Sequence, residues 1–174
     1  MPLKNKKKAI RIKTGRKYNV ACIGGTFDIP IHKGHEALLR KAFERAHFCQ
    51  IGLVTDEYAW RKGKRGIRQY DERKRSLAKF LSSLRIERKR YDISRLDNFF
   101  DQELAKKGCS VEAIIVSTET LPGARGINLI REDVGLRPLD VVEVPMVLAS
   151  DKTAISSTRI RAEEMDRNGK LLLR

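Results

Sequence analysis

The sequence has few cysteines and few aromatic residues, and these shortages exclude several kinds of protein. Its three cysteines, Cys22, Cys49 and Cys109, lie far apart and form no CxxC pair. Three cysteines at such spacing do not suit a disulfide framework or a zinc knuckle, so we expect free thiols, mostly buried. Aromatic residues make up 6% of the chain. That content offers few platforms on which bases could stack and argues against a single-strand-binding module.

The chain also lacks an apolar run long enough to cross a membrane, and its N-terminus has no apolar signal-peptide core. We therefore expect a cytoplasmic protein with no membrane partner. No internal repeat, linker or second domain is evident. A length of 174 residues with 41% hydrophobic content suits one domain with its own core.

Acidic residues are in short supply relative to basic ones. The chain has 37 Lys and Arg against 22 Asp and Glu, a net charge of +15. Residues 1–17 contain basic residues and no acid, so we interpret them as a basic, flexible N-terminal tail that precedes a domain at 18–174. The excess of basic over acidic residues in the whole chain indicates an anionic partner, either a polyphosphate substrate or nucleic acid.

Apolar runs of strand length alternate with segments of helical periodicity. Strands are predicted at residues 18–23, 48–54, 91–96, 111–116 and 139–144. Helices are predicted at residues 34–47, from 71, 97–107, 122–134 and from 156. The alternation indicates an α/β fold, a Rossmann-like, doubly wound parallel sheet of about five strands in a single domain.

Residues 20–43 contain the most informative local pattern. An apolar run ends at Gly24 and Gly25, a short polar loop follows, and an amphipathic helical pattern then begins. This order places backbone N–H groups and a positive helix end at the carboxyl edge of the sheet, where phosphates bind. The glycine spacing matches neither the dinucleotide-binding nor the P-loop fingerprint. His32 and His35 in the loop therefore indicate another kind of phosphate site.

Three further segments carry unusual polar residues directly after predicted strands or at a helix start. They are residues 55–70, which are strongly basic, residues 117–128, and the Ser/Ser/Thr run that begins at Ser156. Loops that follow parallel strands share one edge of the sheet, so we expect these segments to converge with residues 24–35 on one site.

Two segments resemble the signatures of the nucleotidyltransferase superfamily that carries the HxGH motif. Residues 25–28 (Gly-Thr-Phe-Asp) with 32–35 (His-Lys-Gly-His) resemble the first signature, and residues 155–161 (Ile-Ser-Ser-Thr-Arg-Ile-Arg) resemble the second. Within the superfamily the chain is most similar to the archaeal type of phosphopantetheine adenylyltransferase, and the resemblance extends over about residues 18–162.

One departure from the family pattern concerns the first signature. Three residues separate Asp28 from His32, where the family usually has two. Pro30 lies among them and would shape a bulged loop that absorbs the extra residue. The position of His32 therefore depends on that loop, and the position of His35 depends on it less.

The resemblance implies adenylyl transfer from ATP to 4′-phosphopantetheine, which gives dephospho-coenzyme A and pyrophosphate. It also implies Mg²⁺ bound through the ATP phosphates, and we expect no metal site made by the protein alone. His32 and His35 would be the catalytic pair. The residues expected to bind nucleotide or substrate are Gly24, Gly25, Thr26, Phe27, Asp28, Lys62, Lys64, Thr118, Glu119, Asn128, Arg131, Ser156, Ser157, Thr158 and Arg161.

Several of these residues also have a plain structural interpretation. Asp28 could form a turn, the lysines at 62 and 64 could belong to a solvated basic loop, and Glu119 or Thr120 could cap a helix. Asn128 and Arg131 lie three apart on one predicted helix, so we expect them to face the site together. Arg159 and Arg161 lie two apart and point to opposite sides, and the resemblance assigns the phosphate contact to Arg161.

Two other functions stay open at this point. A related nucleotidyltransferase acting on FMN, nicotinamide mononucleotide or glycerol 3-phosphate would share both phosphate signatures. A nucleic-acid-binding module would use the basic tail, and its binding would then fall steeply with salt and disappear without residues 1–17. We do not expect nucleic acid to be the primary partner, and the sequence does not indicate an oligomeric state.

Overall fold

A computed structural model of the chain describes residues 15–98 and 102–172. Most of the predicted tail, residues 1–14, thus lies outside the described residues. The described part contains one sheet of five parallel strands in the order β3-β2-β1-β4-β5. The strands are β1 (Tyr18–Gly25), β2 (Ala46–Val54), β3 (Tyr91–Leu96), β4 (Ala113–Ser117) and β5 (Asp140–Val144). The predicted Rossmann-like parallel sheet is confirmed.

Helices connect the strands and cover both faces of the sheet. They are α1 (Lys33–Arg45), α2 (Asp56–Arg61), α3 (Tyr70–Ser83), α4 (Leu121–Asp133) and α5 (Ser157–Arg161). Short 3₁₀ turns are η1 (Arg88–Arg90), η2 (Gln102–Ala105) and η3 (Thr118–Thr120). Acidic residues in the first turn of α3 and a proline in the first turn of α4 favour helix starts at these points.

Two local predictions differ from the structure. The helix predicted at residues 97–107 is wrong within its described part, where only η2 is helical. Among the residues of that turn whose burial is described, only Leu104 is buried, and a single buried residue gives no apolar stripe on which a longer helix could pack. The helix α2 was not predicted. Its signal was Thr55, whose hydroxyl accepts a hydrogen bond from the N–H of Tyr58 at 3.3 Å and caps the helix.

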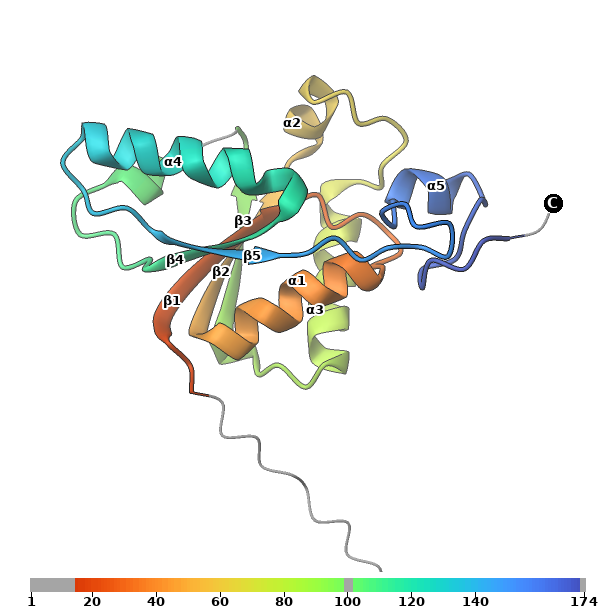
Figure 1. Cartoon of the computed structure of the whole chain (residues 1–174), viewed down its shortest axis with the longest axis horizontal. Helices are drawn as coiled ribbons and strands as arrows, with labels where there is room; N and C mark the ends of the chain where they lie inside the picture. The colour runs from red at the N-terminus through yellow and green to blue at the C-terminus, as the bar shows by residue number, and fades with distance from the viewer. Residues whose placement is uncertain (1–14, 99–101, 173–174) are drawn as a thin grey trace, which may run out of the picture.

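The two faces of the sheet bury separate apolar clusters, because alternate strand residues point to opposite sides. Ala21 and Ile23 of β1 pack with Leu39 of α1 and Leu77 of α3 on one face. Cys22 packs on the other face in a cluster that includes residues of α4. Figure 1 shows α1 and α3 below the sheet and α4 above it. None of the three cysteines, all of which lie in the described residues, forms a disulfide, and Cys22 and Cys49 are buried.

The strand order changes direction between β1 and β4. From β1 the chain proceeds outward through β2 to β3, and it then returns to the other side of β1 to form β4 and β5. The loops that leave β1 and β4 consequently turn to opposite faces and open a crevice at their carboxyl ends. Helix α5 and the C-terminal segment lie beyond these ends (Figure 1). Within residues 15–98 and 102–172, no helix has the length and apolar character needed to span a bilayer.

Candidate active site

A cavity of about 680 Å³ opens at the point where the strand order reverses. Its walls come from the carboxyl ends of β1, β4 and β5, from the first turn of α1, and from the segment that leads into α5. Among the residues predicted to form the site, those that line it are Gly24, Gly25, Thr26, Phe27, Asp28, His32, His35, Lys64, Glu119, Ser156, Ser157, Thr158 and Arg161. The two signatures, about 120 residues apart, thus line one cavity, and Asp28 of the first forms an ion pair with Arg161 of the second.

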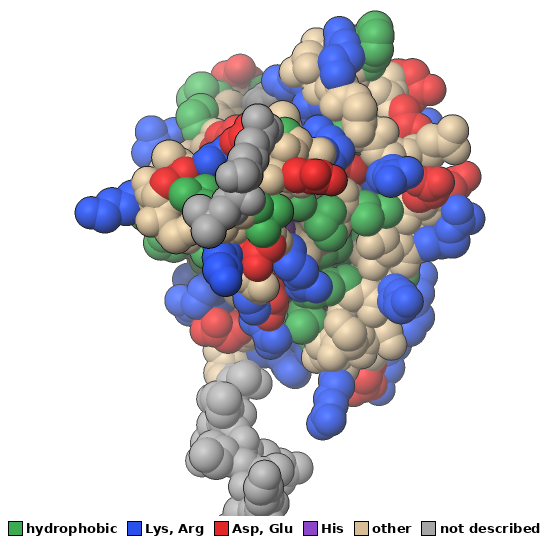
Figure 2. Space-filling view, turned by 90° about the vertical axis from the view of Figure 1, so that its right-hand side faces the viewer, with side chains coloured by type: hydrophobic (Ala, Val, Ile, Leu, Met, Phe, Trp, Pro, Cys, Tyr) green, Lys and Arg blue, Asp and Glu red, His purple; other side chains and the backbone are tan. Residues whose placement is uncertain are grey.

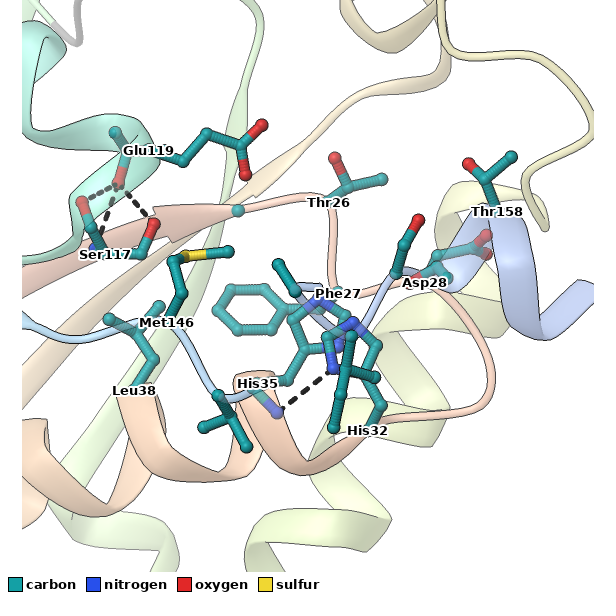
Figure 3. Close-up of a pocket in the computed structure, with 18 of the residues that line it drawn as sticks. Thr26, Phe27, Asp28, His32, His35, Leu38, Ser117, Glu119, Met146 and Thr158 are labelled. Carbon is teal, nitrogen blue, oxygen red and sulfur yellow. Dashed lines mark hydrogen bonds between the residues drawn. The ribbon is translucent and has the colours of Figure 1, made fainter. Parts of the chain in front are cut away.

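The cavity has one end rich in apolar side chains and another rich in phosphate-binding groups. Figure 3 shows Ser117 and Glu119 at one end, Asp28 and Thr158 at the other, and the two histidines between them. Apolar lining comes from Leu38, Val144, Met146, Val147 and Ile155. An apolar wall beside a polar, cationic end suits a ligand with a flat base and a charged tail.

The two histidines lie against each other at the start of α1. Their rings stack with centroids 3.8 Å apart. His32 occupies the N-cap of α1, and its Nδ1 accepts a hydrogen bond from the N–H of Gly34 at 3.1 Å. In the neutral ring the proton then resides on Nε2, which can donate to a ligand. The loop with the extra residue at Ile29–Pro30 thus places His32 in the cavity wall.

His35 is partly buried, and its Nδ1 is fully enclosed without a hydrogen-bond partner among the described residues. Its ring also contacts Phe27, with centroids 5.3 Å apart. A buried polar nitrogen that has no partner is costly, and a ligand oxygen in the cavity would relieve that cost if the ring turned to meet it.

Both imidazoles are held neutral at pH 7. Burial, and then the positive charges of Arg167 and Lys64, lower the pKa of His32 to about 4. Burial, and then His32 and Lys64, lower the pKa of His35 to about 3. Neutral rings donate hydrogen bonds without adding full charges to a site that Lys64 and Arg161 already make cationic.

These lowered pKa values predict that the protein loses stability in mild acid. Between pH 6.5 and about 4 the unfolded chain protonates both histidines while the folded chain does not. The free energy of unfolding should therefore fall with falling pH, by about 1.4 kcal/mol per pH unit for each histidine. Urea unfolding of the parent and of His35→Asn at pH 7, 6 and 5 measures this slope, and the variant should lose about half of it. An equal slope in His47→Asn and His35→Asn would contradict the assignment, because His47 is exposed.

The glycine-rich turn is shaped by Phe27, which is fully buried and has a positive φ of 42°. A Cβ at Gly25 would lie 2.9 Å from the Phe27 ring, closer than side-chain atoms approach. Glycine is therefore required at 25 so that Phe27 can fold under the turn. The packed ring fixes the path of the loop that carries Thr26 and Asp28.

Asp28 connects three segments of the site. Its carboxylate is buried, forms an ion pair with Arg161 of α5, and accepts a hydrogen bond from the backbone N–H of Arg68 at 3.0 Å. Arg161 also donates to the carbonyl of Arg65 at 3.3 Å. The turn-forming role considered for Asp28 is thus replaced by a role as a link between both signatures and the basic loop.

Serine and threonine hydroxyls line the wall formed by the second signature. Ser156 occupies the N-cap of α5, yet its side chain forms no capping hydrogen bond. Arg159 points away from this wall and pairs with Asp151 and Glu164, whereas Arg161 lines the cavity. The two side chains thus point to different sides, as their spacing predicts, and the phosphate contact of Arg161 stays a prediction.

Four predicted site residues do not line the cavity. Asn128 binds both backbone groups of Leu139 through its amide. The Arg131 guanidinium donates to the carbonyls of Arg137 and Leu104. The expectation that these two residues face the site together is therefore not met, because their polar groups satisfy buried backbone around β5 and η2.

Lys62 and Thr118 are the other two predicted site residues that do not line the cavity. Lys62 ends α2 with its Nζ 5.9 Å from the Tyr58 ring. Thr118 donates to Glu143 at 2.7 Å. Thr120 forms a capping box with Ser117, which matches the capping role considered for it.

Arg73, a fully buried arginine behind the site, was not predicted as a site residue. Its guanidinium donates to the carbonyls of Thr26, Val54 and Arg68 at 2.7 to 2.8 Å, and to the Asp56 carboxylate at 2.7 Å. One side chain thereby connects the glycine-rich turn, the end of β2 and the basic loop. Its signal was a cation at position 73 on the helix stripe that also carries Leu77 and Leu81.

Comparisons with known proteins agree with this geometry. A profile described as cytidylyltransferase-like matches residues 22–163. A phosphopantetheine adenylyltransferase of Methanothermobacter thermautotrophicus is 42% identical over 159 residues, which cover 91% of this chain and 93% of the relative. One of Pyrococcus furiosus is 41% identical, with 87% of this chain and 92% of the relative covered.

A solved structure has a fold similar to that of this chain. A protein of unknown function from Archaeoglobus fulgidus superimposes with a TM-score of 0.60 at 27% identity, covering 72% of this chain and 88% of that one. Three findings point to the same family. The two signatures line one cavity, the profile matches most of the chain, and the relatives are near 40% identical to it. The chain belongs to the cytidylyltransferase-like family and, within it, to the phosphopantetheine adenylyltransferases.

Proposed function

We propose that the protein transfers the adenylyl group of ATP to 4′-phosphopantetheine, giving dephospho-coenzyme A and pyrophosphate in coenzyme A biosynthesis. The observation that carries the proposal is that the stacked histidines and the Ser156–Thr158 hydroxyls line the same cavity. The curated relatives support the choice of acceptor, since they are named for it.

The reaction needs no nucleophile from the protein. A phosphate monoester oxygen of the acceptor attacks the α-phosphorus of ATP and forms a new P–O bond. The bond from the α-phosphorus to its β-bridging oxygen breaks, and the electron pair stays with pyrophosphate. The protein has to hold two anions in line and stabilise the charge that develops between them.

The cavity provides donors for that charge at its polar end. His32 would donate from Nε2, and His35 would engage a phosphate oxygen from the adjacent ring. Lys64 and Arg161 would add positive charge at the same end, and Thr26 would bind the transferred phosphate through its hydroxyl. Each well-placed donor of this kind contributes on the order of 10²- to 10³-fold to the rate.

The nucleoside would occupy the other end. Leu38, Met146 and Val147 provide an apolar surface against which the adenine ring can pack. Glu119 lines this end, and its carboxylate could accept hydrogen bonds from ribose hydroxyls. Ser156, Ser157 and Thr158 would then donate to the β- and γ-phosphates at the opposite end.

The residues present suit a magnesium ion held mainly by the substrate. Within the described residues, no three His, Cys, Asp or Glu side chains gather as a metal cage. Asp28 is already engaged by Arg161 and Arg68, which leaves Glu119 as the other carboxylate in the lining. Mg²⁺ would therefore be bound by phosphate oxygens and water, and it would neutralise part of the phosphate charge.

Pyrophosphate release with a panel of acceptors tests the choice of substrate. The acceptors are 4′-phosphopantetheine, FMN, nicotinamide mononucleotide and glycerol 3-phosphate, each with ATP and with CTP. We expect turnover with ATP and 4′-phosphopantetheine, and a kcat/KM at least about 100-fold lower for the other pairs, which is the discrimination that a few unmatched polar contacts give. Preferred turnover of another acceptor would replace the proposed substrate.

A further inference from the structure

A second cavity adjoins the active site on the far side of the Asp28–Arg161 ion pair. Its volume is about 510 Å³. Its apolar walls are Ile29, Pro30, Ile67 and Ile160, and its charged groups are Arg68 and Arg161. Of the residues that line it, only Arg161 takes part in the contacts proposed for ATP and its acceptor.

The two cavities share part of their lining. Ile67 and Arg161 contribute to both. The Arg161 guanidinium is fixed between them by Asp28 and by the carbonyl of Arg65. A group bound to Arg161 from the active-site side therefore lies next to the second cavity.

The balance of charge differs between the two cavities. In the lining of the larger one, the cations Lys64 and Arg161 are matched by the carboxylates of Asp28 and Glu119. The lining of the smaller one includes Arg68 and Arg161 and no acidic residue. Arg161 is paired with Asp28, so Arg68 is the cation of the smaller lining that no carboxylate opposes among the described residues. Its positive charge would attract an anion released in the larger cavity. Figure 2, which views the molecule from the side of α5, shows Lys and Arg side chains spread over this face among acidic ones.

We propose that the second cavity is the exit site for pyrophosphate, with Arg68 as its receiving cation. This proposal rests on the proposed function, because pyrophosphate is the anion that adenylyl transfer produces at the polar end of the active site. Arg161 would contact the leaving group while it is still the β,γ-diphosphate of ATP. Arg68 would take over contact as the α–β bond breaks and pyrophosphate moves outward.

Arg68 is well suited to this role because its side chain has no other assigned contact. It is exposed, and the described residues offer it no hydrogen bond or ion pair. Its backbone, by contrast, is held at both polar groups: the N–H donates to Asp28 and the carbonyl accepts from Arg73. Replacing the side chain should therefore leave the loop in place, while removing the positive charge from the second cavity.

The test compares Arg68→Ala, Arg68→Lys and Arg125→Ala with the parent. Arg125 is an exposed arginine on α4 outside both cavities and serves as a matched control. The forward reaction gives KM for ATP and the inhibition constant of pyrophosphate. The reverse reaction, with dephospho-coenzyme A and pyrophosphate, gives KM for pyrophosphate.

We expect Arg68→Ala to raise both pyrophosphate constants about fivefold, the size of effect that a partly exposed charge contact has, with KM for ATP changed less than about twofold. Arg68→Lys should restore most of the effect, and Arg125→Ala should show none. Unchanged pyrophosphate constants in an active Arg68→Ala protein would overturn the exit site. An equal rise in KM for ATP would also overturn it, because Arg68 would then bind the triphosphate. Failure of the parent to use ATP and 4′-phosphopantetheine at all would instead contradict the proposed function.

Discussion

His35→Ala should lower kcat for adenylyl transfer by about 10²- to 10³-fold, the usual effect of removing a donor to a developing phosphate charge. The ring lies between Phe27 and His32 on the wall that faces the phosphate end of the cavity. Its removal should not unfold the protein, because Nδ1 has no hydrogen-bond partner to lose among the described residues. Steady-state kinetics and urea unfolding at pH 7 measure both effects.

His47→Ala is the matched control for this variant. The chain has three histidines, and the third one, His47, is exposed on β2 outside the cavity. We expect that variant to keep parental activity. His32→Ala should approach the loss seen for His35→Ala, since the two rings stack as a pair. If His35→Ala retained more than about a tenth of the parental kcat, the ring would not donate to the transition state. A fully active His32→Ala would show that the loop around Pro30 had displaced that histidine from any role.

Arg73→Met should destabilise the fold by about 3–5 kcal/mol, the cost of breaking a buried ionic network by removing one partner. The substitution leaves the carbonyls of Thr26, Val54 and Arg68 without their donor. These carbonyls belong to the glycine-rich turn, the end of β2 and the basic loop, so activity should fall along with stability. Urea unfolding at pH 7 provides the free-energy difference.

Arg75→Met provides a control with the same change of residue two positions along α3. Arg75 is exposed, so its replacement should alter the free energy of unfolding by less than about 0.5 kcal/mol. Arg73→Lys separates the effect of the positive charge from the effect of the hydrogen bonds. A lysine keeps the charge but cannot donate to four acceptors in the way that the planar guanidinium does. We expect it to recover part of the stability and little of kcat. Equal stability of the Met variants at 73 and 75 would show that Arg73 does not hold the site together.

The parts of the site carried by local sequence could be predicted, and the parts set by distant contacts could not. The stretch through Gly24, Gly25 and the two histidines predicts a phosphate-binding loop, because strand, turn and helix follow one another within about twenty residues. The convergence of Ser156–Thr158 on the same cavity followed from the parallel sheet. In both cases neighbouring residues and one topological rule suffice.

Asn128, Arg131 and Arg73 illustrate the opposite case. The periodicity of α4 correctly placed the first two on one helix, but their partners Leu139, Arg137 and Leu104 come from other segments. Periodicity shows which residues share a face of a helix, but it does not show which distant segment packs against that face. Arg73 carried a visible signal, a cation in an apolar stripe, although its acceptors at 26, 54 and 68 could be identified only in the folded chain.

The measurement that tests adenylyl transfer most directly uses 4′-phosphopantetheine with ¹⁸O in its phosphate, incubated with ATP, Mg²⁺ and the protein. Mass spectrometry follows the label into the products. Because the acceptor oxygen attacks the α-phosphorus, we expect all of the label in dephospho-coenzyme A and none in pyrophosphate, with His35→Ala forming far less product over the same time. Absence of labelled dephospho-coenzyme A, or label in pyrophosphate, would contradict the account.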